Sequence, residues 1–371
     1  MSVTGAPGKR LSIFLPSLAG GGAERAICGI ANGLAARGVD TTLVLGMAQG
    51  PYMDIVHPAV RVVDLGAPST LQALPRLARH LHRTRPASLL AAMSHANVVA
   101  ALAHRLSASQ ARLVLSERVN LSSVFDAHRE LRTRATLALM RTTYPWADHV
   151  VAVSEGVAQD LTRHVAVPPH RVVTIYNPVV DEHLLAQAAA APAHPWLASG
   201  SVPVVLAAGR LIAQKDFATL IDAFAKLRQG RRARLLILGE GELRAPLMAQ
   251  AARLGVAEDV ALPGFEPNPF AAMRAASVFV LSSRFEGLPG VLIQAMACGA
   301  RVVSTDCPSG PREVLEGGRW GALVPVGDAA RLASAIAAAL DDAHPPEVRL
   351  RAGFFSAQAA VDAYAKVLGL D

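Results

Sequence analysis

The sequence has 371 residues, of which 52 % are hydrophobic and 5 % aromatic, which excludes an intrinsically disordered chain and predicts cores of Ala, Val and Leu. This length fits two domains of roughly 150 to 200 residues each. The net charge of +7 is unevenly spread, because residues 1–178 hold 18 Lys and Arg against 10 Asp and Glu, whereas residues 179–371 hold 18 against 19. A basic first half indicates an anionic partner: an acidic membrane surface, a lipid diphosphate or a nucleic acid.

The cysteine content and the apolar runs bear on the compartment. The cysteines are odd in number and lack the spacing of a zinc site, so we expect reduced thiols in a cytoplasmic protein; they are Cys28, Cys298 and Cys307. No apolar stretch approaches the roughly 20 residues of a membrane-spanning helix. The run Leu11–Leu15 follows Lys9-Arg10 but soon meets a proline and a glycine cluster, which does not fit a signal peptide. We therefore expect a cytoplasmic protein, either free or peripheral to a membrane.

A glycine-rich turn follows the first predicted strand. Leu11–Leu15 runs through Gly20-Gly21-Gly22 into a helical segment, Ala23–Ala36, which is the pattern of a first Rossmann turn. NAD is not the expected ligand, because Arg25 replaces the third small residue of the dinucleotide fingerprint and Asp40 precedes the second strand where it should end it. A turn that needs glycine only for its backbone angles is the alternative interpretation.

Strand-like runs then alternate with helical stretches, which predicts a parallel sheet with helices on both faces. The runs are Thr41–Leu45, Val60–Asp64, Leu89–Met93, Arg112–Ser116, Val150–Ser154 and Val172–Tyr176. Two helical stretches are basic: Leu71–Arg85, and Val124–Met140 with the nearby Arg129, Arg132, Arg134 and Arg141. Each predicts either an amphipathic helix that faces a membrane or an ordinary solvated helix face.

Polar side chains follow two of these strands. Ser116-Glu117-Arg118 ends one strand, and His95 follows another. Because the carboxyl ends of strands line the ligand crevice in open α/β sheets, Glu117 and His95 are candidate catalytic residues. The alternative for His95 is a structural histidine with its hydrogen bonds satisfied.

The second half restarts the same pattern after Tyr176-Asn177-Pro178. Residues 179–202 are rich in Ala and Pro and poorly periodic, so we expect them to include the hinge and linker. Strand Val204–Ala208 then leads through a loop with Arg210 and Lys215 into helix Ala218–Leu227. Two cations five residues apart on a loop between strand and helix suit a diphosphate.

Further strands of the second half end in glycine. Leu235–Leu238 leads to Gly239, and Val260–Leu262 leads to Gly264-Phe265. Phe265 is interpreted either as a ligand contact or as a core residue. Two helices, Ala329–Leu340 and Phe354–Leu368, close the chain.

Residues 282–314 carry the most informative pattern. Strand Val278–Leu281 leads to a loop that holds Glu286, Gly287, Pro289 and Gly290, and a helix follows over Val291–Ala297. A second strand is predicted at Arg301–Ser304. The start of such a helix offers free backbone N–H groups and the positive end of a dipole, which suit a phosphate or diphosphate.

The string E-G-L-P-G-V-L-I-Q-A-M-A-C-G, which begins at Glu286, resembles the carboxylate-x7-carboxylate signature of the retaining, sugar-nucleotide-dependent glycosyltransferases of family 4. The resemblance implies an α/β protein of the GT-B fold, with two Rossmann-like domains facing a central cleft. Residues 1–178 would be the acceptor-side domain and 179–352 the nucleotide-sugar domain. Residues 353–371 would be a helix that crosses back to the first domain.

The resemblance also implies roles for matching residues. Glu286 would accept hydrogen bonds from the donor sugar, and Arg210 and Lys215 would contact the donor diphosphate. Many relatives place a histidine where this chain has Glu117 and Arg118, so the histidine role does not carry over. At the second acidic position of the signature the chain has Gln294. Its amide would form weaker hydrogen bonds to the ribose hydroxyls than the carboxylate of the relatives does. The remaining donor-binding candidates are Gly21, Gly22, Gly239, Gly264, Phe265, Gly287, Leu288, Gly290 and Val291.

The expected reaction is a retaining transfer of a sugar from a nucleotide-diphosphate donor, a UDP-sugar by commonness. The acceptor would be a glycan or a polyprenyl-diphosphate-linked sugar at the inner face of the cell membrane, as in surface polysaccharide assembly. No Asp-x-Asp pair occurs in the sequence, so neither a metal ion nor another cofactor is expected. Three alternatives stay open: a sugar-nucleotide epimerase of the same architecture, a catalytically inactive member, and a nucleic-acid-binding protein, although no nucleic-acid module is recognisable.

Overall fold

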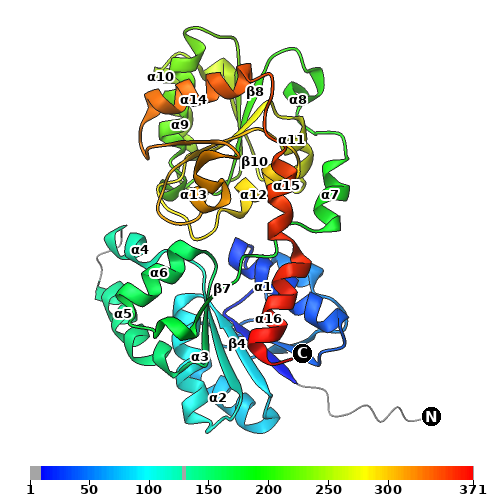
Figure 1. Ribbon diagram of the computed structural model, residues 1–371, viewed down its shortest axis with the longest axis vertical. Helices are drawn as coiled ribbons and strands as arrows, with labels where there is room; N and C mark the ends of the chain where they lie inside the picture. The colour runs from blue at the N-terminus through cyan, green and yellow to red at the C-terminus, as the bar shows by residue number, and fades with distance from the viewer. Residues whose placement is uncertain (1–9, 128–130, 371) are drawn as a thin grey trace, which may run out of the picture. The chain divides into compact units, whose positions relative to one another are not determined.

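The computed structural model describes residues 10–127 and 131–370. The chain forms two compact units. The first contains the chain up to Pro178 together with the segment from Ala357 onward, and the second is Val179–Ser356. Each unit is an α/β sandwich with its own parallel sheet (Figure 1).

The first unit is built on a seven-stranded sheet in the order β3-β2-β1-β4-β5-β6-β7, with every described pair parallel. Its strand order reverses between β1 and β4, so their carboxyl ends flank the point where α/β sheets bind ligands. The strands are β1 (Leu11–Leu15), β2 (Thr41–Leu45), β3 (Arg61–Asp64), β4 (Ser88–Ala92), β5 (Arg112–Glu117), β6 (His149–Ala152) and β7 (Val172–Thr174).

Helices cover both faces of this sheet, as predicted from the alternating pattern (Figure 1). They are α1 (Gly22–Ala36), α2 (Ala73–Thr84), α3 (Ser94–Leu106), α4 (Leu121–Ala127), α5 (Leu131–Thr143), α6 (Glu155–His164) and α16 (Ala357–Leu368). Three single 3₁₀ turns join them: η1 (Pro51–Ile55), η2 (Tyr144–Trp146) and η3 (Pro169–Arg171).

The last helix belongs to the first unit although the residues before it belong to the second. α16 packs beside α1 (Figure 1), and it buries Val361, Tyr364 and Leu368 in the core that α1 and the sheet share. Gly33 of α1 allows this approach, because a Cβ atom there would lie 2.5 Å from Cγ2 of Val361. The expected return of the last helix to the first domain is confirmed, but the helix begins at Ala357 and not at Phe354.

One of the two basic stretches of the first unit differs from the sequence prediction. The stretch 124–140 is not one helix: α4 ends at Ala127, α5 begins at Leu131, and Arg129 lies outside the described residues. The apolar side of α2, with Leu77 and Leu81, is buried in the protein. Its basic side is exposed, and a membrane-facing role for this helix stays a prediction.

The second unit is built on a six-stranded sheet in the order β10-β9-β8-β11-β12-β13. Its order reverses between β8 and β11, which are parallel neighbours. The strands are β8 (Val204–Ala208), β9 (Arg234–Leu238), β10 (Val260–Gly264), β11 (Val278–Leu281), β12 (Val302–Thr305) and β13 (Ala322–Val324).

Its helices are α7 (Glu182–Ala188), α8 (Pro195–Ser199), α9 (Phe217–Arg228), α10 (Arg244–Arg253), α11 (Pro269–Ala275), α12 (Gly290–Ala297), α13 (Pro311–Val314), α14 (Ala329–Asp341) and α15 (Val348–Ala352). The 3₁₀ turns are η4 (Ala213–Lys215), η5 (Ala257–Asp259), η6 (Glu316–Gly318) and η7 (Gly353–Phe355).

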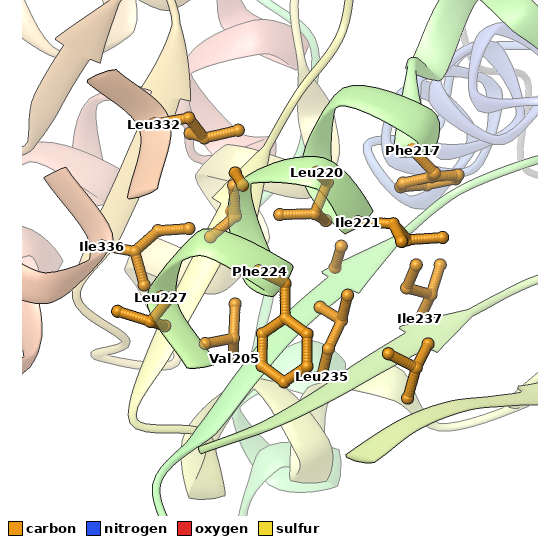
Figure 2. Close-up of a cluster of buried hydrophobic side chains, with 14 of the residues drawn as sticks. Val205, Phe217, Leu220, Ile221, Phe224, Leu227, Leu235, Ile237, Leu332 and Ile336 are labelled. Atoms are coloured by element: carbon orange, nitrogen blue, oxygen red, sulfur yellow. The ribbon is translucent and has the colours of Figure 1, made fainter. Parts of the chain in front are cut away.

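The core of the second unit is formed by α9, the sheet and α14. Figure 2 shows the apolar side chains of α9 between the sheet residues Val205, Leu235 and Ile237 and the α14 residues Leu332 and Ile336. Leu220 and Phe224 are fully buried. This packing fixes α9, and with it the loop that enters α9 from β8.

Most of the segment 179–202, which was predicted to include the hinge and linker, is folded, although the second unit does begin at Val179. It contains α7 and α8, and α7 packs against α11. The Asp181 side chain caps α7 by accepting from Leu184 N at 2.7 Å, and Asn268 Nδ2 donates to Gln187 O at 3.0 Å. A cap and a few tertiary bonds hold a segment whose composition alone suggests no structure.

Candidate active site

The candidate site in the second unit lies at the carboxyl ends of β8 and β11, where the strand order reverses. The loop after β8 carries Arg210 and Lys215, and the loop after β11 carries Glu286. The topology thus brings together two loops that are about 70 residues apart in the sequence, at the position where open α/β sheets bind ligands.

Lys215 and Glu286 form a direct ion pair at this position. Lys215 Nζ donates to Glu286 Oε1 at 2.6 Å, and Ser283 Oγ donates to the same oxygen at 2.6 Å. The Glu286 side chain is 8 % exposed and that of Lys215 17 %. Both of these bonds end on Oε1, and Oε2 of Glu286 takes part in neither of them.

Backbone and side-chain bonds hold the two loops together. Ser282 Oγ donates to Lys215 O at 2.7 Å. Gln214 Nε2 donates to Phe285 O at 2.9 Å, and Arg284 N donates to Gln214 O at 2.8 Å. The candidate side chains of Lys215 and Glu286 are therefore held in fixed positions before any ligand binds, as a binding site would require.

The segment after Glu286 leads into α12 and presents its N-terminus. The first intrahelical bonds are donated by Leu292 and Ile293 to Pro289 O, so the N–H groups of Gly290 and Val291 have no acceptor within the helix. Gly287 and Leu288 are buried, and Gln294 is half-buried. This end of the helix suits an anion, as the sequence predicts.

Arg210 is exposed on the loop after β8. A second cation lies on the neighbouring loop, because Arg284 is 58 % exposed and its Nε lies 3.1 Å from Asp216 Oδ2. Sequence reasoning missed Arg284 and Ser283. Their position in the string S-S-R-F-E, between strand β11 and Glu286, could have identified them as candidates.

The glycines at the ends of β9 and β10 have a packing role. Gly239 has φ +138°, and a Cβ atom there would lie 2.0 Å from Gly209 O. At Gly264, with φ +107°, a Cβ atom would lie 2.7 Å from Glu240 Oε1. Glycine is needed at Gly239 because the loops after β8 and β9 cross closely, whereas at Gly264 the requirement comes from the positive φ. Phe265 is 79 % exposed, so its interpretation as a core residue is wrong.

Cys307 lies near this ion pair and is buried. Burial raises the pKa of its thiol to about 12, and the nearby Glu286 carboxylate adds to the rise. All three cysteines are unpaired and buried. The prediction of free thiols is confirmed, and at neutral pH these thiols stay protonated.

The other candidates, Gly21, Gly22, His95 and Glu117, lie in the first unit. The glycine turn follows β1, and Tyr52 Oη donates to Gly20 O at 3.1 Å. The Glu24 carboxylate folds over Gly21, where a Cβ atom would lie 2.3 Å from its Oε2. His95 is exposed in the first turn of α3, which follows β4.

Glu117 is fully buried at the end of β5. Tyr144 Oη donates to its Oε2 at 2.7 Å, while Ser94 Oγ and Arg118 N each donate to its Oε1 at 3.0 Å. Burial raises the pKa of this carboxyl group, and the hydrogen bond from Tyr144 lowers it in part. A carboxyl group enclosed in this way holds the ends of β5 and α3 together and offers no surface to a substrate.

Within residues 10–127 and 131–370, no three His, Cys, Asp or Glu side chains gather as a metal site would require.

Comparisons with known proteins place these features in context. The model of the family described as glycosyl transferases group 1 matches residues 202–342, and that of glycosyltransferase family 4 matches residues 20–183. The lipopolysaccharide core biosynthesis glycosyltransferase LpsE of Rhizobium meliloti is 30 % identical over 363 residues, which cover 94 % of this chain and 96 % of that protein.

A second relative, from Campylobacter jejuni, is named N-acetylgalactosamine-N,N'-diacetylbacillosaminyl-diphospho-undecaprenol 4-alpha-N-acetylgalactosaminyltransferase. It is 29 % identical over 376 residues, which cover 97 % of this chain and all of that protein. Among solved structures, Anabaena HepE in complex with UDP-glucose has a TM-score of 0.81 at 21 % identity, over 97 % of this chain and 99 % of that chain. Sucrose-phosphate synthase from Thermosynechococcus elongatus also has a TM-score of 0.81, at 19 % identity over 96 % of this chain and 98 % of that chain. These two likenesses show a shared fold.

Proposed function

The chain belongs to glycosyltransferase family 4, the group 1 glycosyl transferases of GT-B fold, and from this premise we propose a retaining transfer from a nucleoside-diphosphate sugar that needs no metal ion. It is a glycosyltransferase whose relatives act in lipopolysaccharide and polysaccharide assembly. The observation that carries the proposal is the buried Lys215–Glu286 pair at the carboxyl ends of β8 and β11. UDP-glucose, the ligand of the Anabaena neighbour, is the first donor to test.

Charge on the departing nucleotide is the main demand of this reaction. In the proposal, Lys215, Arg210 and the N-terminus of α12 stabilise the diphosphate as the bond between the anomeric carbon and the phosphate oxygen breaks. Glu286 accepts hydrogen bonds from hydroxyls of the donor sugar, and Ser283 orients it at 2.6 Å. The acceptor oxygen attacks on the face that the nucleotide leaves, and its proton passes to the departing phosphate.

The acceptor that we propose is a glycan or a polyprenyl-diphosphate-linked sugar. The name of the Campylobacter relative places a diphospho-undecaprenol-linked sugar in its reaction. A basic first half supports the same class, because no acidic residue occurs between Asp64 and Glu117. A lipid diphosphate and the anionic headgroups around it carry the complementary charge.

The test of this function uses donor turnover. Purified protein is incubated with UDP-glucose and other nucleotide sugars, with and without acceptor, in EDTA, and the products are identified by mass spectrometry. We expect nucleoside diphosphate release that EDTA does not abolish. Turnover that needs an added divalent ion contradicts the metal-free mechanism, and an epimerised nucleotide sugar formed without acceptor contradicts transfer.

Lys215→Ala is the matched variant for this test. It removes the cation and leaves the Glu286 carboxylate in the site, so we expect kcat to fall about 10²- to 10³-fold. Lys226→Ala is the control, because Lys226 is an exposed lysine near the far end of α9. Equal turnover in the two variants contradicts the role of Lys215, and absence of turnover in all proteins with every donor indicates an inactive member.

We further propose a peripheral, electrostatic contact with anionic membranes through α2. None of the helices in the described parts of the chain is long and apolar enough to cross a membrane. Arg79 and Arg83 are exposed one turn apart on α2, whose apolar side is buried. Flotation with phosphatidylglycerol vesicles should recover the protein at low salt and lose it in Arg79→Glu/Arg83→Glu, whereas equal recovery with neutral vesicles contradicts the contact.

A further inference from the structure

Arg118 is a buried cation, and only one of its three guanidinium nitrogens has a hydrogen-bond partner among the described residues. It follows Glu117 at the end of β5 in the first unit and is 7 % exposed. Nη1 donates to Ser116 Oγ at 3.3 Å, and that hydroxyl pairs with Tyr364 Oη of α16 at 3.1 Å. The other two nitrogens, Nε and Nη2, are buried and have no hydrogen-bond partner among the described residues.

The two nitrogens without a partner form the edge of the guanidinium group that can bind an oxyanion with two hydrogen bonds. Nε–H and Nη2–H point in parallel from one edge of the planar guanidinium, and this edge binds both oxygens of a carboxylate or phosphate side-on. Nη1, on the other edge, is the nitrogen that Ser116 holds. The protein thus fixes the group from one side and leaves its bidentate side unused.

An unpaired edge of this kind is costly to bury. Burial lowers the pKa of Arg118, and the nearby Tyr364 hydroxyl and the Glu117 and Glu24 carboxylates oppose this shift. Glu117 already accepts from Tyr144, Ser94 and the Arg118 backbone, and none of the described bonds joins its carboxylate to the guanidinium. Groups left unsatisfied at such a cost are concentrated at binding sites.

The surroundings of Arg118 are those of a ligand site. β5 lies beside β4, which borders the reversal of strand order with β1. The other strand at this reversal, β1, leads into the glycine turn that precedes α1. In the proposed function the donor diphosphate is held by Lys215 and Arg210, which belong to the other unit.

We propose that Arg118 binds, through Nε and Nη2, an oxyanion of the acceptor, either a phosphate of a lipid diphosphate or a carboxylate of an acidic sugar. The identification of this oxyanion as part of the acceptor rests on the proposed function. The test measures binding and does not depend on turnover. In this structure Nε and Nη2 are closed from solvent, so binding requires the side chains that cover them to move.

The test is titration calorimetry with farnesyl diphosphate, glucuronate and UDP as separate probes. Arg118→Gln should weaken binding of farnesyl diphosphate or of glucuronate at least tenfold, and the probe that weakens identifies the source of the oxyanion. Arg118→Lys should lose nearly as much, because an ammonium keeps the charge but not the fork. Arg163→Gln, at an exposed arginine of α6, should change nothing.

Three results overturn the proposal: equal affinities for both acceptor probes in wild type and Arg118→Gln, full affinity in Arg118→Lys, or a tenfold loss of UDP binding in Arg118→Gln. Melting temperature gives a second readout. Arg118→Met should melt at the same temperature as wild type or higher, because it removes an uncompensated charge, and a fall of several degrees points to a structural arginine instead. If wild type binds an acceptor probe but not UDP, the donor assignment fails while the Arg118 site stands.

Discussion

At the scale of single residues, two of the buried carboxylates, Glu286 and Glu117, show how hydrogen-bond partners decide the role of a side chain. Glu286 has a cation at 2.6 Å and an oxygen outside both of its bonds. Glu117 has neutral donors on both oxygens and is completely enclosed. The same residue type after a strand is therefore partly free to meet a ligand in one unit and fully enclosed by the protein in the other, which fits the binding role that we propose for Glu286.

Tyr144→Phe tests the structural role of Glu117. It removes the donor to Glu117 Oε2 and the acceptor of Asn97 Nδ2, both in the core, so the free energy of unfolding should fall by about 1–3 kcal/mol. The pKa of Glu117 is already raised, and loss of this donor raises it further. A raised pKa gives stability that is present below the unfolded value and lost as pH rises through the folded value. The fall in the free energy of unfolding caused by Tyr144→Phe, measured by urea titration, should therefore be larger at pH 8 than at pH 5.

Tyr52→Phe is the control for that experiment, because its hydroxyl donates at 3.1 Å to Gly20 O in an exposed bond. We expect a change below about 0.5 kcal/mol. Equal losses for the two variants, or a Tyr144→Phe loss that does not change with pH, contradict the assignment of Glu117.

Gln294 is the residue where the chain departs from the signature of its family. It is half-buried on α12, eight positions after Glu286, and no described hydrogen bond uses its side-chain amide. A carboxylate there would accept charge-assisted bonds from the two ribose hydroxyls. We predict that Gln294→Glu lowers the donor KM several-fold with little change in kcat, measured by initial rates. An unchanged KM means that this side chain does not contact the ribose.

At the scale of elements, loops at the strand ends set the shape of the site. The loop after β9 approaches the loop after β8 so closely that Gly239 has no room for a Cβ atom. Gly239→Ala should cost about 2 kcal/mol or more, through the collision with Gly209 O and the positive φ. Gly230→Ala is the control, because nothing lies within 4 Å of its Cβ position. Similar melting temperatures for the two variants contradict this account.

Sequence periodicity was sufficient for the strands and for most helices, because apolar runs and helical spacing are local signals. It failed for α7 and α8, whose Ala- and Pro-rich sequence is held by the Asp181 cap and by Asn268. Lys215 and Glu286 were predictable from motifs, but their contact depends on the pairing of β8 with β11. The environment of Glu117 was not predictable, because Ser94 and Tyr144 lie 23 and 27 residues away along the chain.

At the scale of the whole molecule, the chain returns at its end to the unit where it began. Val361, Tyr364 and Leu368 of α16 are 4 %, 0 % and 1 % exposed, in the core formed by α1, β1 and β2. Arg37, which directly follows α1, adds an ion pair at 2.6 Å to Asp362, and such a pair contributes little at the surface. The first unit is thus completed by residues that follow the second unit in the sequence.

Truncation after Ser356 tests this dependence. Burial of one large apolar side chain is worth about 1.5–3 kcal/mol, so loss of three removes a large part of the roughly 5–15 kcal/mol that stabilises a domain. We expect calorimetry to show a strongly lowered transition for the first unit and a nearly unchanged one for the second. Val361→Asp should act in the same direction, because it places a charge against Gly33 of α1, whereas Lys366→Ala on the exposed side of α16 should not. Two unshifted transitions in the truncated chain mean that the first unit folds without α16, and a parallel loss of both means that the units melt as one.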